Sequence, residues 1–339
     1  MMVVRQSEPG DLESLMALAA LAGPGLTTLP RSEDVLSEHL SDSQRAFKKT
    51  VTRPRGERYL LVMEDLMSGD IVGCAGLVGC VGGFDPHYSY ALRTVVKQSE
   101  GVGVVKEIRT LNLVEDHKGP SEIGTLFVHP GHRGGGNGRL LSLSRFALMA
   151  ACPQRFTTDV IAEMRGNVDP EKGSPFWQAV GQHFFEMDFV DADQRSAANK
   201  QFIADLMPVH PLYIPMLPQE AQAAVGAVHP EAQPALKLLQ DEGFVFGHEV
   251  DIFDAGPLYR ASIQEIRTVA QSQVRPLSSV VSSEPDGPQY LVSRDTVCMR
   301  ACLGGVHLND DHSVTLSRAC ALALQLRIGD PVRFVSARP

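Results

Sequence analysis

A glycine-rich turn between an apolar strand and a long amphipathic helix constrains this chain more than any other part of its sequence. The turn covers residues 129–138, HPGHRGGGNG, and the helix expected after it covers residues 139–152. Glycines allow backbone conformations that direct several N–H groups into one concavity. The start of the helix adds unpaired N–H groups and a positive dipole end. The segment therefore predicts a pyrophosphate site formed mostly by the main chain.

The spacing of this turn distinguishes between families of phosphate-binding loops. It lacks the Lys-Ser/Thr pair of a P-loop, and it is not a G-x-G-x-x-G turn followed at a distance by an acidic residue. It reads R-x-x-G-x-G, which resembles the CoA-pyrophosphate loop of the GNAT acyltransferase superfamily. The resemblance implies that Arg133, Gly134, Gly136 and Gly138 contact CoA. A glycine turn with only a structural role is the alternative.

The elements expected before this turn are typical of the same superfamily. We expect a strand at residues 2–5, a helix with Asp11 as its N-cap, and a hairpin with strands at 59–63 and 71–78. Residues 82–103 are glycine-rich and contain tyrosines, so we expect a long loop there.

The expected fold belongs to the α/β (α+β) class. It is GNAT-like, with a mixed, mostly antiparallel sheet flanked by helices, an elaborated second half and a small β-rich C-terminal unit. A length of 339 residues favours two units. We expect residues 1–257 to form the acyl-CoA-binding catalytic region and residues 258–339 to form a small mixed or β-rich unit. Residues 250–254 are expected to be a strand, and the Ser- and Pro-rich residues 275–288 to be a loop.

A set of segments spread in order through the first 257 residues carries a closer resemblance. They are MMVVR at the start, GLTTLP at 25–30, SE at 121–122, TLF at 125–127, IAEMRG at 161–166, SPFW at 174–177, FIADLMP at 202–208, VHP at 228–230 and DIFDAGP at 251–257. Over this region the chain resembles the bacterial arginine N-succinyltransferases. The run DPHYSY at 85–90 departs from the family's aromatic-Tyr-Asn-Tyr pattern, which leaves the identity of the acceptor open.

The resemblance implies transfer of a succinyl group from succinyl-CoA to the α-amino group of L-arginine. It places the family's proton donor at His229, and imidazole titrates near neutrality. It places a CoA-contacting residue at Leu126, on the strand before the glycine turn. The backbone N–H at that position is expected to stabilise the thioester oxyanion.

Three charged residues on two neighbouring predicted strands are candidates for handling the acceptor. Glu122 begins the strand that often carries the general base in GNAT enzymes. Either Glu122 or Glu163 could bind the cationic substrate or relay its proton. Arg165 could grip a carboxylate with two hydrogen bonds. A structural Glu–Arg pair is the alternative reading of Glu163 and Arg165.

Composition argues against several classes of partner. The net charge of −9 disfavours nucleic acid, and no apolar stretch approaches the roughly 20 residues of a membrane span. The six cysteines form no CxxC pair, so we expect free thiols and no metal site. The N-terminus lacks the apolar core of a signal peptide, which favours a cytoplasmic location. No permanently bound cofactor is expected, because direct acyl transfer requires only the co-substrate succinyl-CoA.

Two other functions are compatible with these patterns. One is acylation of ornithine or another small amine, which would keep the fold and the use of CoA. The other is a non-catalytic GNAT-like subunit that binds CoA and regulates a partner. The family includes paralogous subunits that pair, so either a homo-oligomer or pairing with such a subunit is expected.

Overall fold

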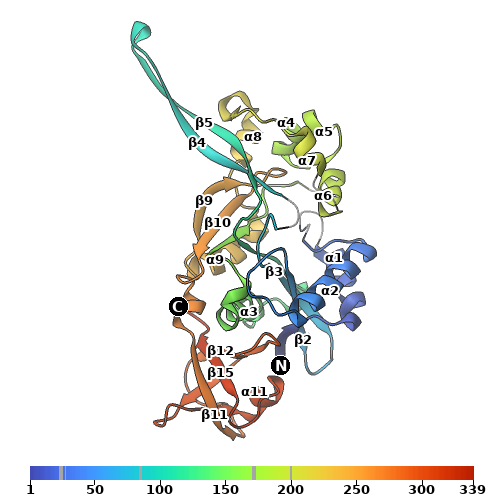
Figure 1. The fold of residues 1–339 in the computed structure, drawn as a ribbon, viewed down its shortest axis with the longest axis vertical. Coiled ribbons are helices and arrows are strands. Elements are labelled where there is room, and N and C mark those ends of the chain that lie inside the picture. The colour runs from blue at the N-terminus through green and yellow to red at the C-terminus, as the bar shows by residue number, and fades with distance from the viewer. Residues whose placement is uncertain (23–25, 27, 84–85, 170–172, 199–200) are drawn as a thin grey trace.

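The protein is described here from a computed structural model, which covers residues 1–22, 26, 28–83, 86–169, 173–198 and 201–339. The molecule is elongated, with a two-stranded arm at one end and the C-terminal strands at the other (Figure 1). Helices and loops cover the sheet between these two ends. Across the described ranges, none of the helices is long and apolar enough to cross a lipid bilayer.

One continuous sheet runs through the whole molecule. Its strand order is β12-β15-β11-β14-β13-β1-β2-β3-β6-β7-β10-β9-β4-β5-β8. Neighbouring strands are antiparallel except in two pairs, β6–β7 and β11–β14. The expected mixed, mostly antiparallel sheet is therefore confirmed.

The N-terminal segment forms one half of the central sheet and the helices beside it. The elements are β1 (Met2–Gln6), α1 (Leu12–Ala22), α2 (Glu33–Lys48), β2 (Arg58–Asp65) and β3 (Ile71–Val78). The expected N-cap at Asp11 is wrong. Asp11 instead ends a 3-10 turn, where its Oδ2 accepts a hydrogen bond from the Glu8 backbone N–H at 2.7 Å. Its carboxylate also pairs with Arg5 on β1, at 2.9 Å, which ties the turn to the sheet.

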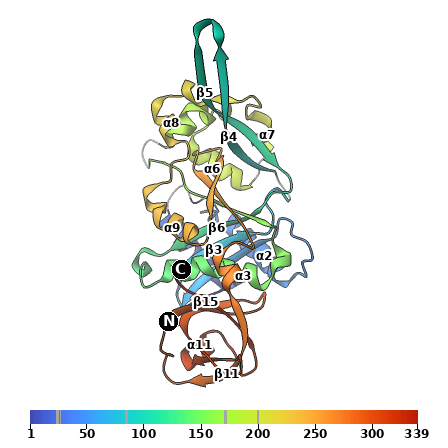
Figure 2. The same ribbon diagram turned by 90° about the vertical axis from the view of Figure 1, so that its left-hand side faces the viewer.

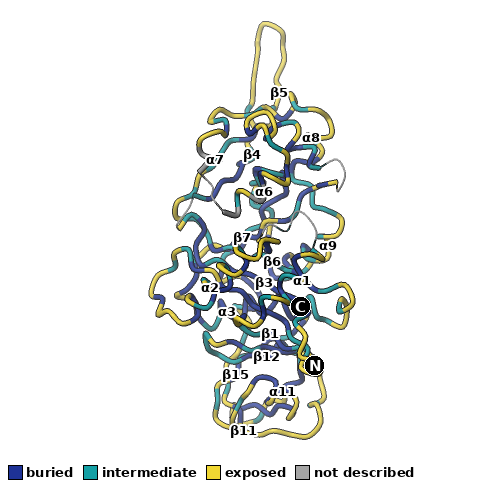
Figure 3. The backbone as a smooth tube through the Cα atoms, turned by 90° about the vertical axis from the view of Figure 1, so that its right-hand side faces the viewer, coloured by how far each residue is buried: buried dark blue, intermediate teal, exposed yellow. Residues whose placement is uncertain are grey.

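The segment expected to be a loop at residues 82–103 is largely a strand, with residues 84–85 outside the described ranges. β4 (His87–Ser99) and β5 (Val104–Asp116) pair along their full length and form the arm in Figure 1. Tyr88 and Tyr90 are buried at its base, whereas the residues towards its tip are exposed (Figure 3). The sequence pattern failed here because a strand with both faces in solvent has no alternation of apolar and polar residues.

The middle of the chain carries the strand and helix that flank the glycine turn. β6 (Ser121–Val128) leads into the turn, α3 (Asn137–Ala151) follows it, and β7 (Asp159–Glu163) returns to the sheet. The apolar residues of α3 pack against the central strands in the largest hydrophobic core. The strand–turn–helix order expected from the sequence is confirmed.

Short helices and strands cover the region between β7 and the C-terminal unit. They are α4 (Pro175–Ala179), α5 (Gly181–Phe185), α6 (Phe189–Ala198), α7 (Gln201–Leu206), β8 (Leu212–Tyr213), α8 (Gln219–Ala224), α9 (Gln233–Asp241), β9 (Val245–Val250) and β10 (Pro257–Ser262). The strand expected at 250–254 is misplaced. β9 ends at Val250, and Asp251 starts a turn whose backbone N–H groups bond to its own side chain.

The C-terminal strands close into a small ring (Figure 2). The elements are α10 (Arg267–Gln271), β11 (Gln273–Val281), β12 (Gln289–Arg294), β13 (Arg300–Leu308), β14 (Val314–Ser317), α11 (Arg318–Ala323) and β15 (Pro331–Ser336). β12 pairs with both β15 and β13, so the five strands have no free edge. β11 occupies part of the expected loop at 275–288, so that expectation is wrong for its first half.

The β-rich character of the C-terminal unit agrees with expectation, but its expected start at residue 258 falls inside β10. That strand pairs with β7 and β9 of the central sheet. The ring itself begins at β11, after α10 has packed against α3. The division of the chain into two units stays a prediction.

Candidate active site

Strands β6 and β7 pair over only a short length. Their parallel pairing is confined to Ser121 and Glu122 of β6, while β7 continues beside β10 as far as Glu163. Beyond Glu122, β6 keeps its other neighbour, β3. From residue 123 onwards, the side of β6 that faces β7 therefore pairs with no described strand, and we call it the open side of β6.

A β-bulge lies in this open part of β6. On β3, Cys74 pairs with Phe127 and Gly76 pairs with Gly124. Two residues of β6, Thr125 and Leu126, therefore lie opposite the single residue Ala75 of β3. Thr125 has a φ of 54°, an unusual value for a β-branched residue. A bulge interrupts the hydrogen-bond ladder, and the Leu126 N–H lies at this interruption.

The bulge is held in place by Thr28. The Thr125 N–H donates to Thr28 Oγ1 at 3.2 Å, and Thr125 Oγ1 donates to the Thr28 carbonyl at 3.3 Å. The side chain of Leu126 packs against the main hydrophobic core. The contribution of Leu126 to a bound thioester would therefore come from its backbone.

The glycine turn is open to solvent on the side that leads into α3. Gly134, Gly135 and Gly136 all have positive φ, at 98°, 58° and 89°. Gly134 and Gly135 are exposed, and a Cβ added at either, or at Gly138, would meet nothing within 4 Å. The turn is not buried against protein, as a ligand-binding turn requires.

The turn is also braced from within and from the C-terminal ring. The Asn137 side chain donates to the His132 carbonyl at 2.8 Å, and its backbone N–H donates to the Gly134 carbonyl at 3.0 Å. A Cβ at Gly136 would lie 3.0 Å from the side chain of Leu303 on β13. The first N–H groups of α3 have no partner within the helix and point out of its N-terminal end.

Arg133 lies on the strand side of the turn. Its Nε donates to the Val128 carbonyl at 3.3 Å, and its guanidinium carbon lies 5.9 Å from the centre of the Phe127 ring. These contacts hold the base of the side chain beside the end of β6. Contact between Arg133 and a pyrophosphate stays a prediction.

A cavity of about 270 Å³ opens beside the bulge. Its lining includes Glu122 and Thr125 from β6, Glu163 from β7, and Arg165 just beyond it. Helices α6 and α7 also contribute to the lining. The structure thus brings together all three residues that the sequence proposed for the acceptor, on the open side of β6.

A histidine and a glutamate meet inside this cavity. His87 Nε2 lies 2.8 Å from Glu163 Oε1, and the side chain of His87 is 7% exposed whereas that of Glu163 is 32% exposed. His87 is the first residue of β4, so the base of the arm supplies part of the wall. A carboxylate that is both anchored and accessible suits a cationic ligand.

Two aspartates lie close to Glu163. Asp251 Oδ1 accepts from the Phe253 and Asp254 N–H groups at 2.7 and 2.8 Å, and Asp254 accepts from Gly166 and Gly256, both at 2.7 Å. Burial, followed by the neighbouring Asp254 and Glu163 carboxylates, raises the pKa of Asp251, and burial raises the pKa of Asp254. A bound cation would relieve this cost, because it favours the ionised carboxylates.

His229 lies next to Arg165 outside the cavity lining. Its backbone N–H donates to the Arg165 carbonyl at 2.9 Å, and its Nδ1 accepts from the Glu231 N–H at 3.2 Å. The neutral ring therefore carries its proton on Nε2. Burial and the Arg165 charge lower the pKa of His229. Among the described residues, the side chain of Arg165 forms one ion pair, with Glu231, and it is long, at 3.6 Å.

Sequence reasoning did not identify His87, Asp251 or Asp254 as site residues. The DIFDAGP segment at 251–257 contributes to the family resemblance, but the resemblance assigns no role to its two aspartates. A signal was present, since an Asp-x-x-Asp-x-Gly sequence predicts an Asx-type turn in which the carboxylates bond to nearby backbone N–H groups. His87 offered no local signal, because its partner Glu163 is 76 residues away.

Comparisons with known proteins cover the whole chain. Residues 2–268 match the family described as Arginine N-succinyltransferase beta subunit, and residues 273–336 match its C-terminal domain. An arginine N-succinyltransferase of Salmonella schwarzengrund is 40% identical, covering 99% of this chain and 97% of the relative. One of Enterobacter sp. is 39% identical, covering 100% and 98%.

A solved structure shares the fold over the full length. It is the arginine/ornithine succinyltransferase subunit AI from Pseudomonas aeruginosa, with a TM-score of 0.91, 33% sequence identity, and coverage of 100% of this chain and 99% of that chain. The agreement extends through the arm and the C-terminal ring, since both chains are covered almost entirely.

Proposed function

This chain belongs to the arginine N-succinyltransferase family and is an acyltransferase, and from that premise we propose that it transfers the succinyl group of succinyl-CoA to the α-amino group of L-arginine. The observation that carries the proposal is the position of the open side of β6. It lies between an exposed glycine turn at the start of α3 and a cavity lined by carboxylates. A thioester donor and a cationic amine can therefore meet beside one bulged strand.

The glycine turn and α3 account for the donor. The exposed Gly134 and Gly135 and the N-terminal end of α3 bind the pyrophosphate through main-chain N–H groups. The CoA arm then follows the open side of β6, where the Leu126 N–H in the bulge stabilises the thioester oxygen as it becomes an oxyanion. Leu126, Gly134, Gly136, Gly138 and Arg133 are the residues that we assign to CoA.

The acidic cavity accounts for the acceptor. Glu163, Asp251 and Asp254 provide negative charge for the guanidinium, with Glu163 held by His87. Arg165 binds a carboxylate of the substrate or of the succinyl group, and its long 3.6 Å ion pair with the exposed Glu231 supports this role. The carboxylates of the cavity therefore match the positive guanidinium of the arginine substrate, and Arg165 matches a negative carboxylate.

The chemical step needs two proton transfers. The amine nitrogen attacks the thioester carbon, the C–N bond forms, the C–S bond breaks, and the amine proton leaves. Glu122, at the start of β6 and in the cavity lining, accepts that proton. His229, in its imidazolium form, protonates the departing thiolate and is left as the neutral ring, and its lowered pKa makes that imidazolium a stronger acid.

Initial rates of CoA release from succinyl-CoA test this assignment. Arginine is compared with citrulline, which has nearly the same shape but no positive charge, and with agmatine, which lacks the α-carboxylate. We expect turnover with arginine and a loss of at least about 100-fold in kcat/KM with citrulline, because the carboxylates would face an uncharged group. Normal CoA binding without turnover on any amine would instead favour a non-catalytic CoA-binding subunit.

Ornithine is a second candidate acceptor. The similar Pseudomonas aeruginosa structure carries both amino acids in its name. The sequence at 85–90 departs from the family pattern, and His87 and Tyr88 of this run line the cavity. Ornithine has a shorter cationic side chain, so it would reach the same carboxylates less closely. The ratio of kcat/KM for arginine and ornithine, measured with the same enzyme, decides between them.

We also propose a cytoplasmic location, where CoA thioesters are available. All six cysteines are free thiols in the structure, which suits a reducing compartment.

A further inference from the structure

The cavity beside the bulge extends past the residues assigned to the acceptor. Its lining continues from Glu122 on β6, across β3, to Arg58 on β2 and His39 on α2. The proposed chemical step uses neither of these two basic side chains. The cavity therefore has an acidic end, where Glu163 lies, and a second end that carries an arginine.

The register of the sheet places Arg58 and Glu122 on the same face. Arg58 pairs with Val78 of β3, and Val78 pairs with Glu122 of β6. Residues that pair directly in antiparallel strands point to the same side of the sheet. Neighbouring strands lie about 4.8 Å apart, so the two Cα atoms are separated by roughly 10 Å. The two side chains therefore border one stretch of the cavity from either side of β3.

Glycines form the sheet surface between the bulge and this row of residues. Gly76 and Gly124 pair with each other, two positions from Val78 and Glu122, and both line the cavity. A Cβ added at Gly124 would lie 3.6 Å from Glu122 Oε1 and 3.7 Å from Thr28, which are ordinary contact distances. The cavity therefore reaches the sheet surface at Gly124, between the bulge and Arg58.

The guanidinium of Arg58 is held by an uncharged partner. Its Nη1 lies 3.0 Å from His39 Nε2, and an arginine can only donate, so the imidazole nitrogen accepts. Burial, followed by the charge of Arg58, lowers the pKa of His39 to about 4, so the ring is neutral near pH 7. Among the described residues, Arg58 forms no ion pair. The guanidinium is therefore oriented while its positive charge stays available to an anion.

The number of charges in the two substrates matches the number of arginines in the cavity. Succinyl-CoA and arginine each bring one carboxylate to the reaction, the end of the succinyl group and the α-carboxylate. Among the described lining residues, Arg58 and Arg165 are the two guanidinium groups, and there is no lysine. Arg165 follows Glu163 by two positions, so it lies with the acidic residues at the acceptor end. Arg58 is then left for the succinyl carboxylate.

We propose that Arg58, positioned by His39, binds the free carboxylate of the succinyl group and thereby selects a dicarboxylic acyl group over a monocarboxylic one. This inference rests on the proposed transfer from succinyl-CoA. The acyl chain runs from the Leu126 N–H over Gly124 to Arg58. A guanidinium grips a carboxylate with two parallel hydrogen bonds, whereas an acyl group that ends in a methyl leaves both donors without that partner.

Calorimetric titration of the full chain with succinyl-CoA and butyryl-CoA tests the subsite. The two acyl chains have the same length, but butyryl ends in a methyl group. The unmodified protein should bind succinyl-CoA about 10- to 100-fold more tightly. Arg58→Gln should remove this preference without changing the Kd for free CoA, and should lower kcat/KM for succinyl-CoA by a similar factor. Arg58→Lys should keep part of the preference, because it keeps the charge but loses the planar fork.

The positioning role of His39 has its own variant. His39→Phe removes the acceptor for Arg58 Nη1 and adds no charge, so it should weaken the preference for succinyl-CoA and leave the Kd for free CoA unchanged. A His39→Phe protein with the full preference would remove His39 from the subsite.

The matched control is Arg53→Gln, which removes the same charge from an exposed side chain before β2 that is not part of the described lining. This control should keep the full preference. The proposal is overturned by an unmodified protein without the preference, or by Arg58→Gln with it. A raised KM for arginine at unchanged preference would place Arg58 on the α-carboxylate instead. A protein that loses the preference with Arg58→Gln but acylates no amine would keep the acyl subsite and contradict only the proposed transfer.

Discussion

At the scale of single residues, the tautomer and the pKa of His229 are set by its neighbours. Its Nδ1 is occupied by the Glu231 N–H, and the Arg165 charge disfavours the imidazolium. We expect His229→Ala to lower kcat by about 100- to 1,000-fold, the usual contribution of a general acid, with little change in the Kd for CoA. Stopped-time assays of CoA release and calorimetric CoA titration give the two numbers. His183→Ala, at an exposed position, should leave both unchanged.

The same neighbours predict how the pH profile will move. Burial and Arg165 lower the pKa of His229, so the ring stays neutral to a lower pH than a free imidazole does. Arg165→Gln removes the second cause, and the pKa of His229 should then rise. A general acid must be protonated, so the alkaline limb of the rate profile reports this pKa. That limb, or the imidazole proton shift by NMR, should move to higher pH in this variant. A limb that stays in place would show that Arg165 does not act on His229.

At the scale of elements, the glycine turn combines strained backbone with open space. Gly134 has a φ of 98°, and a Cβ added there would meet nothing within 4 Å, so alanine at this position would strain the backbone without a steric clash. Gly69, between β2 and β3, has a φ of 80°, and a Cβ added there would also meet nothing within 4 Å. Alanine at either position should cost about 1 kcal/mol of stability, the usual cost of a left-handed residue.

Only one of these two glycines lies at the proposed CoA site. Gly134→Ala should therefore raise the Kd for CoA about tenfold or more, because a methyl group and a shifted backbone disturb the N–H groups that face the pyrophosphate. Gly69→Ala should leave CoA binding unchanged at a similar loss in melting temperature. Equal Kd values in the two variants would argue against pyrophosphate binding at this turn.

The elements that the sequence predicted are those with a buried apolar face. β6, α3 and β7 pack into the main core, so their hydrophobic patterns were readable. For β4 the sequence predicts a loop, because the part of this strand in solvent has no such pattern and its length depends on pairing with β5. For the second part of β11 the sequence also predicts a loop, because most residues of this strand are exposed.

The same reasoning separates the two halves of the site. The donor half is local in the chain, because β6, the glycine turn and α3 are consecutive, so a motif could reveal it. The acceptor half joins His87, Glu163, Asp251 and Asp254 from three distant segments. Only the pairing of β7 with β10 and of β9 with β4 brings these segments together. No sequence spacing encodes that arrangement.

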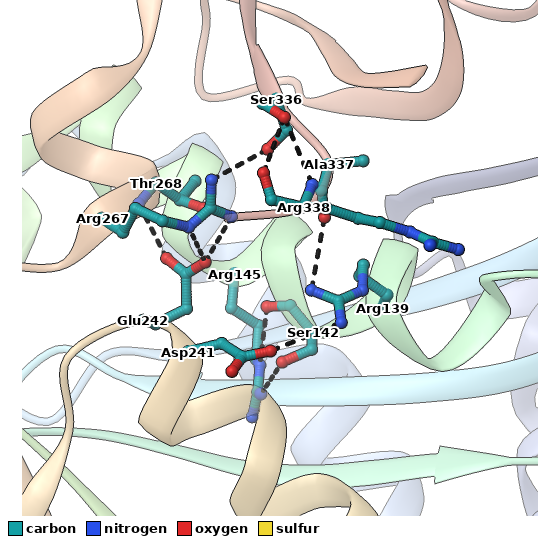
Figure 4. A network of polar contacts seen from close by, with 10 residues as sticks. All are labelled: Arg139, Ser142, Arg145, Asp241, Glu242, Arg267, Thr268, Ser336, Ala337 and Arg338. Carbon is teal, nitrogen blue, oxygen red and sulfur yellow. Dashed lines mark hydrogen bonds and ion pairs between the residues drawn. The ribbon is translucent and has the colours of Figure 1, made fainter. Parts of the chain in front are cut away.

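At the scale of the whole molecule, a polar network joins α3 and α9 to the C-terminal segments. Arg267 donates to Glu242 from Nε and Nη2, at 3.0 and 2.6 Å, and from Nη1 to the Ser336 carbonyl at 2.9 Å. Arg139 at the start of α3 reaches the Ala337 carbonyl at 3.3 Å and Asp241 at 3.5 Å. Figure 4 shows these contacts as one cluster, so the helix that carries the glycine turn is tied to the C-terminal unit through side chains.

We expect Arg267→Ala to lower the free energy of unfolding strongly, because it breaks this connection. The Glu242 side chain is fully buried and that of Arg267 is 9% exposed, so the substitution leaves an unpaired buried carboxylate. Removing one partner of such a pair costs about 3–5 kcal/mol, or roughly 6–20 °C in melting temperature. The control is Lys237→Ala, which removes a 2.8 Å ion pair with Asp241 from a side chain that is 72% exposed and should cost less than about 0.5 kcal/mol. If calorimetry finds the two variants equally stable, the buried pair does not hold the C-terminal unit to the helix layer.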